Sequence, residues 1–185
     1  MSAQMGSDGH DFLLRFSRRY SMAHRLTSGA APNCSVPHGH DEVVTVDIVS
    51  EKNAGLNPET NMLVEFDQVK RRWFQWIDKA VDHSFHLAES DPLIGYFRDH
   101  EPHLLAKILV TPGDPTTEIK TACYHSKLMA FLNAENPSYL CKRLVIQETP
   151  TNSVEFAGRS AEGILPAGDH WWSRADQSIN DLQVA

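Results

Sequence analysis

Apolar and polar residues alternate in two neighbouring segments of the chain, residues 12–26 and 42–50. The apolar positions that carry this alternation are Phe12, Leu14, Phe16, Val44, Val46 and Ile48. Successive side chains of an extended strand point to opposite faces, so the pattern predicts two strands that are each buried on one face. The residues between them are mostly small or are Gly and Pro, which is typical of a loop. The two segments therefore predict an antiparallel pair of strands joined by a long loop.

A helical period follows these strands. Between Glu65 and Val81, apolar residues recur three and four positions apart, which places them on one face of a helix. These apolar positions are Val69, Trp73, Trp76, Ile77 and Ala80. A second helix is predicted to be capped by Asp114, to have Pro115 at its first position and to end before Pro137.

Two further strands complete the pattern. Residues 140–149 are typical of a strand, and a turn cluster separates them from the short strand 154–158, so the two predict a hairpin. Residues 86–112, between the two helices, are interpreted as a polar connection. The predicted fold class is therefore α+β, with a four-stranded antiparallel sheet and two helices on one face. Such a sheet leaves two open edges, so we expect a homo-oligomer formed by edge pairing.

Length and composition indicate a single domain. We expect it to span residues 1–158, with a flexible N-terminus over 1–11, and to be followed by an irregular C-terminal tail over 159–185. The formal net charge of −7 argues against binding to nucleic acid or to an anionic membrane, because a polyanion requires a concentrated basic surface. No segment approaches the roughly 20 apolar residues of a membrane-spanning helix, and the polar start lacks the apolar core of a secretory signal. We therefore place the protein in the cytoplasm.

Three histidines near the first loop form a candidate metal site. His38 and His40 are separated by Gly39, and side chains at i and i+2 of an extended backbone point to the same side. His24 ends the preceding predicted strand, and a returning hairpin would bring it beside this pair. Three neutral imidazoles suit Zn²⁺ and leave a fourth position open, which distinguishes a catalytic zinc site from a structural one.

Cys34 lies four residues before His38 and has three possible roles. It is a fourth metal ligand, a general base or nucleophile beside the metal, or a loop cysteine without a role. The thiolate is the reactive form of cysteine, and a neighbouring dication stabilises it. With Cys123 and Cys141 it makes an odd number of cysteines without a CxxC pair, so we expect free thiols.

Three further acidic residues and one histidine bear on acid/base chemistry or binding. Asp82 and His83 directly follow the first predicted helix, where the turning backbone would let the carboxylate orient the imidazole. Glu148 lies late in the third predicted strand, on a face with apolar residues, and a ligand with two parallel N–H donors would pair with it. Glu118, in the first turn of the second helix, is by default a carboxylate favoured by the helix dipole.

These short motifs occur in an order that resembles the 6-pyruvoyltetrahydropterin synthase family, which includes 6-carboxytetrahydropterin synthases. The resemblance covers the chain from about Phe12 to Phe156. The motifs that carry it are FSRRYSMAHRL, CSVPHGH, EFDQVK, VDH, PTTE and QET. Asp41 and Glu42 depart from the family pattern, in which the HGH motif is usually followed by Asn or Ser and then an aromatic residue.

The resemblance implies the tunnelling fold (T-fold), in which subunits join edge to edge in a barrel and barrels stack into hexamers. It also implies that the sites lie between subunits. The implied zinc ligands are His24, His38 and His40. The implied catalytic residues are Cys34 as general base and His83, held by Asp82, as proton shuttle. The implied substrate-binding residues are Glu148, Thr117 and Glu118.

The implied reaction is zinc-dependent turnover of 7,8-dihydroneopterin triphosphate without a redox cofactor. The three-residue interval between Cys34 and His38 resembles the carboxy branch, which cleaves the side chain, releases acetaldehyde and leads to queuosine. We therefore expect 6-carboxy-5,6,7,8-tetrahydropterin as the product. The alternatives are the pyruvoyl branch, an oligomer that binds zinc and a pterin without catalysis, and a structural zinc module with Cys34 as fourth ligand.

Overall fold

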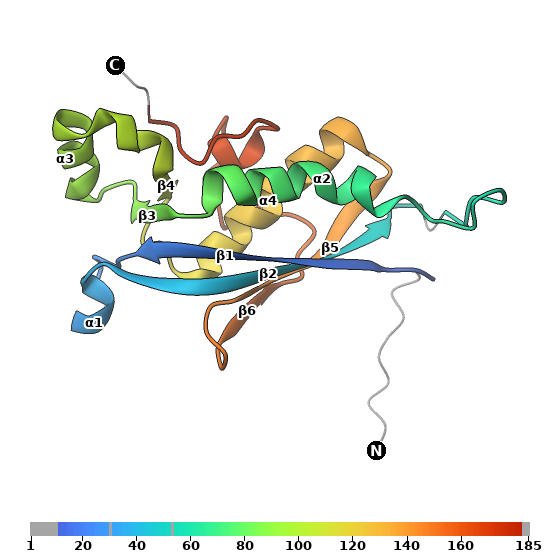
Figure 1. Cartoon of the computed structure of the whole chain (residues 1–185), viewed down its shortest axis with the longest axis horizontal. Helices are drawn as coiled ribbons and strands as arrows, with labels where there is room; N and C mark the ends of the chain where they lie inside the picture. The colour runs from blue at the N-terminus through green and yellow to red at the C-terminus, as the bar shows by residue number, and fades with distance from the viewer. Residues whose placement is uncertain (1–10, 30, 53, 183–185) are drawn as a thin grey trace.

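The computed structural model describes residues 11–29, 31–52 and 54–182 of the chain. A six-stranded mixed sheet, in the order β4-β3-β1-β2-β5-β6, carries the two longest helices on one face (Figure 1). The strands are β1 Leu14–His24, β2 His38–Ser50, β3 Ser84–Ala88, β4 Ile108–Thr111, β5 Tyr139–Gln147 and β6 Ser153–Phe156. The α-helices are α1 Pro32–Ser35, α2 Phe66–Trp76, α3 Pro92–His100 and α4 Thr117–Glu135. The short helical segments are the π-helix η1 Ile77–Val81 and the 3₁₀-helices η2 Pro102–Lys107 and η3 Trp171–Ser173.

The β1–β2 hairpin confirms the first two predicted strands. The strands pair antiparallel over their whole common length, from Leu14 opposite Ile48 to His24 opposite His38. Side chains at even positions of β1 face the helices, which explains the alternation in the sequence. The loop was expected to include the HGH motif, and that boundary was wrong: β2 begins at His38, so the motif is already strand.

The predicted four-stranded antiparallel sheet corresponds to β1, β2, β5 and β6. The interpretation of residues 86–112 as a mere connection was wrong, because this segment holds most of β3 and all of α3 and β4. β3 pairs parallel with β1 at Met22–His24, and β4 pairs parallel with β3. Strands of five and four residues are too short to show a clear alternation, and their pairing depends on distant residues.

Both predicted helices exist, and α4 ends at Glu135, before Pro137 as predicted. α2 ends at Trp76 and continues as the π-helix η1 to Val81. The cap predicted at Asp114 was wrong: Thr116 caps α4 by accepting a hydrogen bond from the Ile119 amide. The Asp114 carboxylate instead accepts hydrogen bonds from the amides of the 27–28 segment, at 2.9 and 2.7 Å. Asp114 therefore fastens the β1–α1 loop to the segment before α4.

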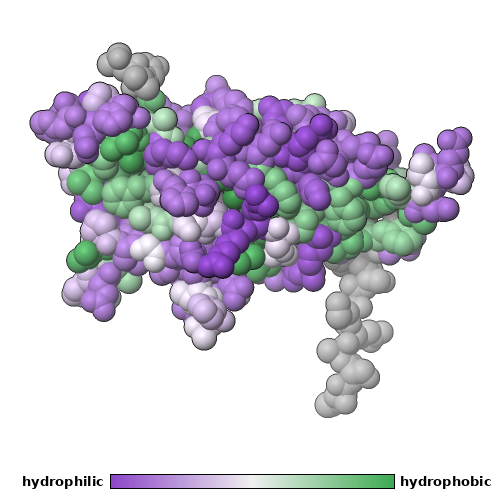
Figure 2. Space-filling view, viewed as in Figure 1, coloured by the Kyte–Doolittle hydropathy of each residue, from purple (hydrophilic) through white to green (hydrophobic). Residues whose placement is uncertain are grey.

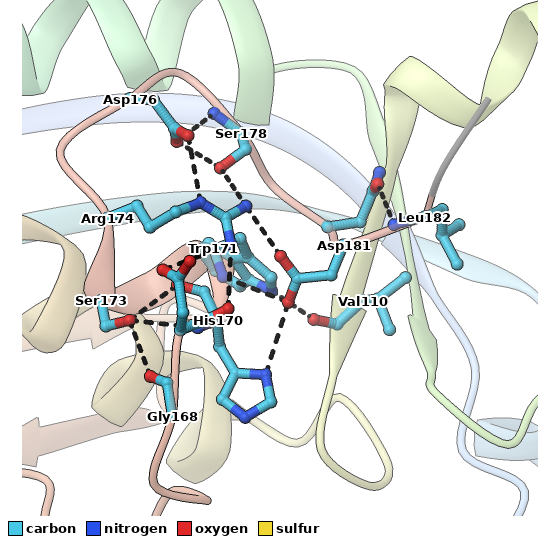
Figure 3. A network of polar contacts seen from close by, with 12 residues as sticks. Val110, Gly168, His170, Trp171, Ser173, Arg174, Asp176, Ser178, Asp181 and Leu182 are labelled. Carbon is cyan, nitrogen blue, oxygen red and sulfur yellow. Dashed lines mark hydrogen bonds and ion pairs between the residues drawn. The ribbon is translucent and has the colours of Figure 1, made fainter.

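The segment after Gly158 is irregular apart from η3, and it packs into the same hydrophobic core as α2 and α4. Trp171 is fully buried and stacks on Trp76 with ring centroids 6.0 Å apart. Its indole N–H donates to the Val110 carbonyl at 2.7 Å, and its own carbonyl accepts from Lys127 Nζ at 2.8 Å. Figure 3 shows the polar contacts around it, in which Arg174 and Asp181 form an ion pair of 2.7 Å.

Replacing Trp171 by Ala should therefore lower the free energy of unfolding by about 3–5 kcal/mol, because it removes a buried aromatic side chain and leaves a cavity. Chemical denaturation measures this change. Ile164→Ala is the matched control in the same segment: Ile164 is 54% exposed, so the change should stay within about 0.5 kcal/mol. Equal stability of Trp171→Ala and the parent would show that this segment does not support the core.

The sheet leaves strand edges that no described strand covers. Opposite β2, β1 pairs with β3 only at Met22–His24, so residues 14–21 have no strand partner on that side within the described ranges. The edge strand β4 is covered differently, because the Val110 amide donates to the Ile179 carbonyl at 3.0 Å. Figure 2 shows hydrophobic residues along the middle of the visible side, below the mainly hydrophilic outer surface of the helices.

The expected flexible N-terminus, residues 1–11, lies outside the described residues apart from Asp11. None of the helices in the described part of the chain combines the length and the hydropathy that crossing a bilayer requires.

Candidate active site

The pairing of β1 with β2 brings the three predicted metal ligands together. His24 lies directly opposite His38, and His40 lies one rung further along the same face, opposite Met22. One ring nitrogen from each histidine lies within 4.8 Å of the others. The ring planes of His24 and His38 are both inclined at 85° to that of His40. This arrangement directs three nitrogen atoms at one point.

The hydrogen bonds of His24 and His38 show that this point suits a cation. The Nδ1 atoms of His24 and His38 lie 3.0 and 2.9 Å from the carbonyl oxygens of Pro115 and Val36, so each Nδ1 must carry the proton and donate it. A neutral imidazole then has a lone pair at Nε2, and the two Nε2 atoms face each other at 3.0 Å. Two lone pairs at this distance repel each other unless a positive ion lies between them. The residues therefore fit a metal ion.

Burial holds His24 in the form that binds metal. The side chain is 3% exposed, and burial lowers its pKa to about 4, with a further contribution from the positive charge of Lys120. Neutral imidazole is the ligand form of histidine. Gly39 permits the close approach of the two strands, because a Cβ atom at this position would lie 2.8 Å from the Met22 carbonyl oxygen.

The histidine cluster forms one wall of a pocket of about 570 Å³. Cys34, in α1, and the turn between β5 and β6 form other parts of the wall. The predicted site residues that line the pocket are His24, Cys34, His38, His40, Thr117, Glu118 and Glu148. Seven of the nine predicted residues therefore meet in one pocket of a single chain, although the strands, helices and loop that carry them span residues 24–148 of the sequence.

Glu148 is held as a carboxylate in this pocket. The hydroxyl of Thr117 donates to Glu148 Oε1 at 2.6 Å. Burial by itself would raise the pKa of the Glu148 carboxyl, but the Thr117 hydrogen bond and the nearby Lys120 charge outweigh it, so the pKa lies below its ordinary value. An ionised carboxylate accepts two parallel N–H donors.

Comparison with known proteins agrees with the order of motifs and the pocket. The family model for 6-pyruvoyl tetrahydropterin synthase matches residues 14–159, which is most of the chain. The chain belongs to this family. A 6-carboxy-5,6,7,8-tetrahydropterin synthase from Rickettsia bellii is 27% identical over 146 residues, which cover 77% of this chain and 99% of the relative.

Solved structures share the fold of this family member. An uncharacterized protein from Wolinella succinogenes has a TM-score of 0.61 at 20% identity, covering 79% of this chain and 97% of its own. The 6-pyruvoyl tetrahydropterin synthase of Caenorhabditis elegans has a TM-score of 0.53 at 22% identity, covering 80% and 95%. At these identities the likeness concerns the fold, which is the T-fold.

Asp82 and His83 form the expected pair but lie outside the pocket of this pterin synthase family member. Asp82 Oδ2 accepts from His83 Nδ1 at 2.7 Å, while Asp82 Oδ1 accepts from the Ser21 amide at 2.9 Å. His83 has a positive φ of 60°, and 77% of its side chain is exposed. The pair therefore sits beside the open edge of β1, next to Ser21.

The two acidic residues after the HGH motif do not enter the pocket either. Asp41 is bound by Ser21 and Arg19 on the other face of the sheet. Glu42 is fully buried beside Lys120. Sequence reasoning missed Lys120 entirely, because a lysine within a helix gives no signal that it is buried. It also missed Asn152, which lines the pocket and was recognised only as part of a turn cluster.

Proposed function

We propose that this chain converts 7,8-dihydroneopterin triphosphate and water into 6-carboxy-5,6,7,8-tetrahydropterin, acetaldehyde and triphosphate. The observation that carries the proposal is the single pocket in which three histidines, Cys34 and the Glu148 carboxylate meet. The name of the Rickettsia bellii relative supports the carboxy product. Such a product would feed 7-deazapurine synthesis, as in the queuosine route.

Each group in the pocket has a role in this proposal. A zinc ion held by His24, His38 and His40 would act as a Lewis acid on the side-chain hydroxyls of the substrate and so acidify the neighbouring carbon-bound protons. The Glu148 carboxylate would accept two N–H groups of the pterin ring and thereby orient it. Cys34, in the wall of the same pocket, would remove a proton from the oriented side chain.

The proton shuttle would come from a second copy of the chain. Asp82 orients His83 but lies outside the pocket of its own chain, beside the uncovered edge of β1. Pairing of uncovered strand edges between copies would cover these edges and bring His83 of one copy toward the pocket of the next. We therefore propose a homo-oligomer with its sites between subunits.

Incubation of the zinc-loaded protein with 7,8-dihydroneopterin triphosphate tests the reaction. Mass spectrometry should identify 6-carboxy-5,6,7,8-tetrahydropterin, and an aldehyde assay should find acetaldehyde in equal amount. A pterin that keeps its three-carbon side chain, without acetaldehyde, would instead assign the pyruvoyl reaction. Tight binding of the pterin without turnover would assign a binding protein.

A further inference from the structure

A buried ion pair lies beneath the histidine cluster. Lys120 Nζ is 2.5 Å from Glu42 Oε1, and both side chains are fully buried. The hydroxyl of Tyr20 donates to the second carboxylate oxygen, Glu42 Oε2, at 2.5 Å. The sheet and α4 thus hold a lysine and a glutamate away from water, and no role in the proposed reaction accounts for them.

Stability is a weak explanation for a buried ion pair of this kind. Removing two charges from water is costly, and their attraction recovers this cost only with close contact and further hydrogen bonds. Apolar residues of similar volume at such positions are often as stable or more stable. An effect of the pair on the groups around it is therefore the better explanation for its presence.

Its surroundings are the metal cluster and the pocket. Glu42 lies two residues after His40 on the same face of β2, so the two Cα atoms are roughly 7 Å apart along the strand. Across the hairpin, Tyr20 lies opposite Glu42 in the same way as His24 lies opposite His38. The pair is the next layer of side chains below the three histidines.

The pair also joins the histidine strand to the helix that completes the pocket. The segment leading into α4 and its first turns make three successive contacts with the site: Pro115 with His24, Thr117 with Glu148, and Lys120 with Glu42. Lys120 lies one turn beyond Thr117, and its charge helps to lower the pKa of Glu148. The charge of Lys120 therefore acts on Glu148, a residue of the pocket wall.

We infer that the Lys120–Glu42 pair is a positioning element that ties β2 to α4 below the histidine cluster and sets the affinity of that cluster for a divalent cation. The inference rests on the proposed metal site and deepens it. As a pair, the two charges act in opposite directions at the metal position. A single remaining charge would act on a dication across a distance of about one side-chain layer, where a low effective dielectric constant makes the interaction strong.

The sign of the effect differs between the two single variants. Glu42→Gln leaves the Lys120 ammonium uncompensated, so it should raise the dissociation constant for zinc by about tenfold or more. Lys120→Met leaves the Glu42 carboxylate uncompensated, so it should lower that constant by a similar factor. Lys120→Arg keeps the charge and should return the constant to the parent value.

To measure these changes without substrate, the protein is first stripped of metal. Its zinc affinity is then determined by titration in competition with a chromophoric chelator. Asp47→Asn is the matched control: Asp47 is a buried carboxylate of the same strand that pairs with Arg15 and Arg143 on the other face. It should bind zinc like the parent. Shifts of the same sign in both single variants, or no shift in either, would overturn the inference.

A reversed pair decides the question where a single variant does not fold. The double variant Glu42→Lys with Lys120→Glu retains a buried ion pair but places the ammonium on β2, two residues from His40. Its zinc dissociation constant should rise by about tenfold, and an unchanged constant would overturn the inference. Zinc binding by the parent without turnover of the pterin would overturn the proposed function alone, and a parent that does not bind zinc would overturn both.

Discussion

Cys34→Ala should lower kcat for 7,8-dihydroneopterin triphosphate by about 10²–10⁴-fold while leaving zinc bound, because a positioned general base contributes on this scale. Cys34 lines the pocket but lies in the short helix α1, whereas the three histidines lie in β1 and β2. The histidine cluster should therefore form without it. Steady-state kinetics and metal analysis on the same preparation measure the two effects, and turnover at the parent rate would exclude Cys34 as the base.

Mixing two inactive variants tests the assignment of Cys34 as the base. It also tests whether the second proton-transfer group, His83, belongs to the same chain or to a neighbouring one. His83→Ala should also be inactive, since the Asp82–His83 pair is the other proposed acid/base group. If each site uses Cys34 of one copy and His83 of its neighbour, mixed oligomers of Cys34→Ala and His83→Ala chains should recover part of the parent activity. The unmixed variants are the controls. No recovery after subunit exchange would place both groups in the same chain.

His40→Ala should raise the zinc dissociation constant by more than about 100-fold and abolish turnover. Loss of an outer hydrogen-bond partner of a metal ligand already costs 10–100-fold in affinity, so loss of a ligand should exceed this range. Without His40, only His24 and His38 remain, and a two-ligand site holds zinc weakly. Zinc content per chain should therefore fall from about one to near zero. His103→Ala is the control, because His103 is exposed in η2 and should leave both quantities unchanged.

The fold should survive this loss of metal. The hydrophobic core is built from β1, β2, β5, α2, α4 and the segment after Gly158, and the three histidines are not part of it. Circular dichroism of His40→Ala, or of the chelated parent, should therefore keep the parent spectrum. Unfolding on chelation would instead favour the structural zinc module, in which metal binding and folding are coupled.

Local periodicity was sufficient to predict the elements whose pattern depends only on neighbouring residues. The alternation at Leu14, Phe16, Val44 and Val46 predicted β1 and β2 because each strand has one buried face. The same holds for the spacing that predicted α2. In contrast, β3 and β4 are short parallel strands. The residues of β3 lie 62 positions after their partners in β1, and those of β4 lie 23 positions after their partners in β3, so no local pattern marked either strand. Similarly, Thr116 rather than Asp114 caps α4, because Asp114 is used by the distant 27–28 segment.

For the candidate site, the sequence by itself determined the chemistry that was available. The spacing of His38 and His40, the position of His24 at a strand end and the order of the motifs pointed to a metal site of a pterin synthase. Only the tertiary structure decided which groups meet. It brought Glu148 and Thr117 into the pocket, left Asp82 and His83 outside it, and turned Glu42 inward to Lys120, 78 residues away. The physical reason is that a residue's type and spacing define what it can bind, whereas burial and ion pairing depend on the residues that the folded chain places beside it.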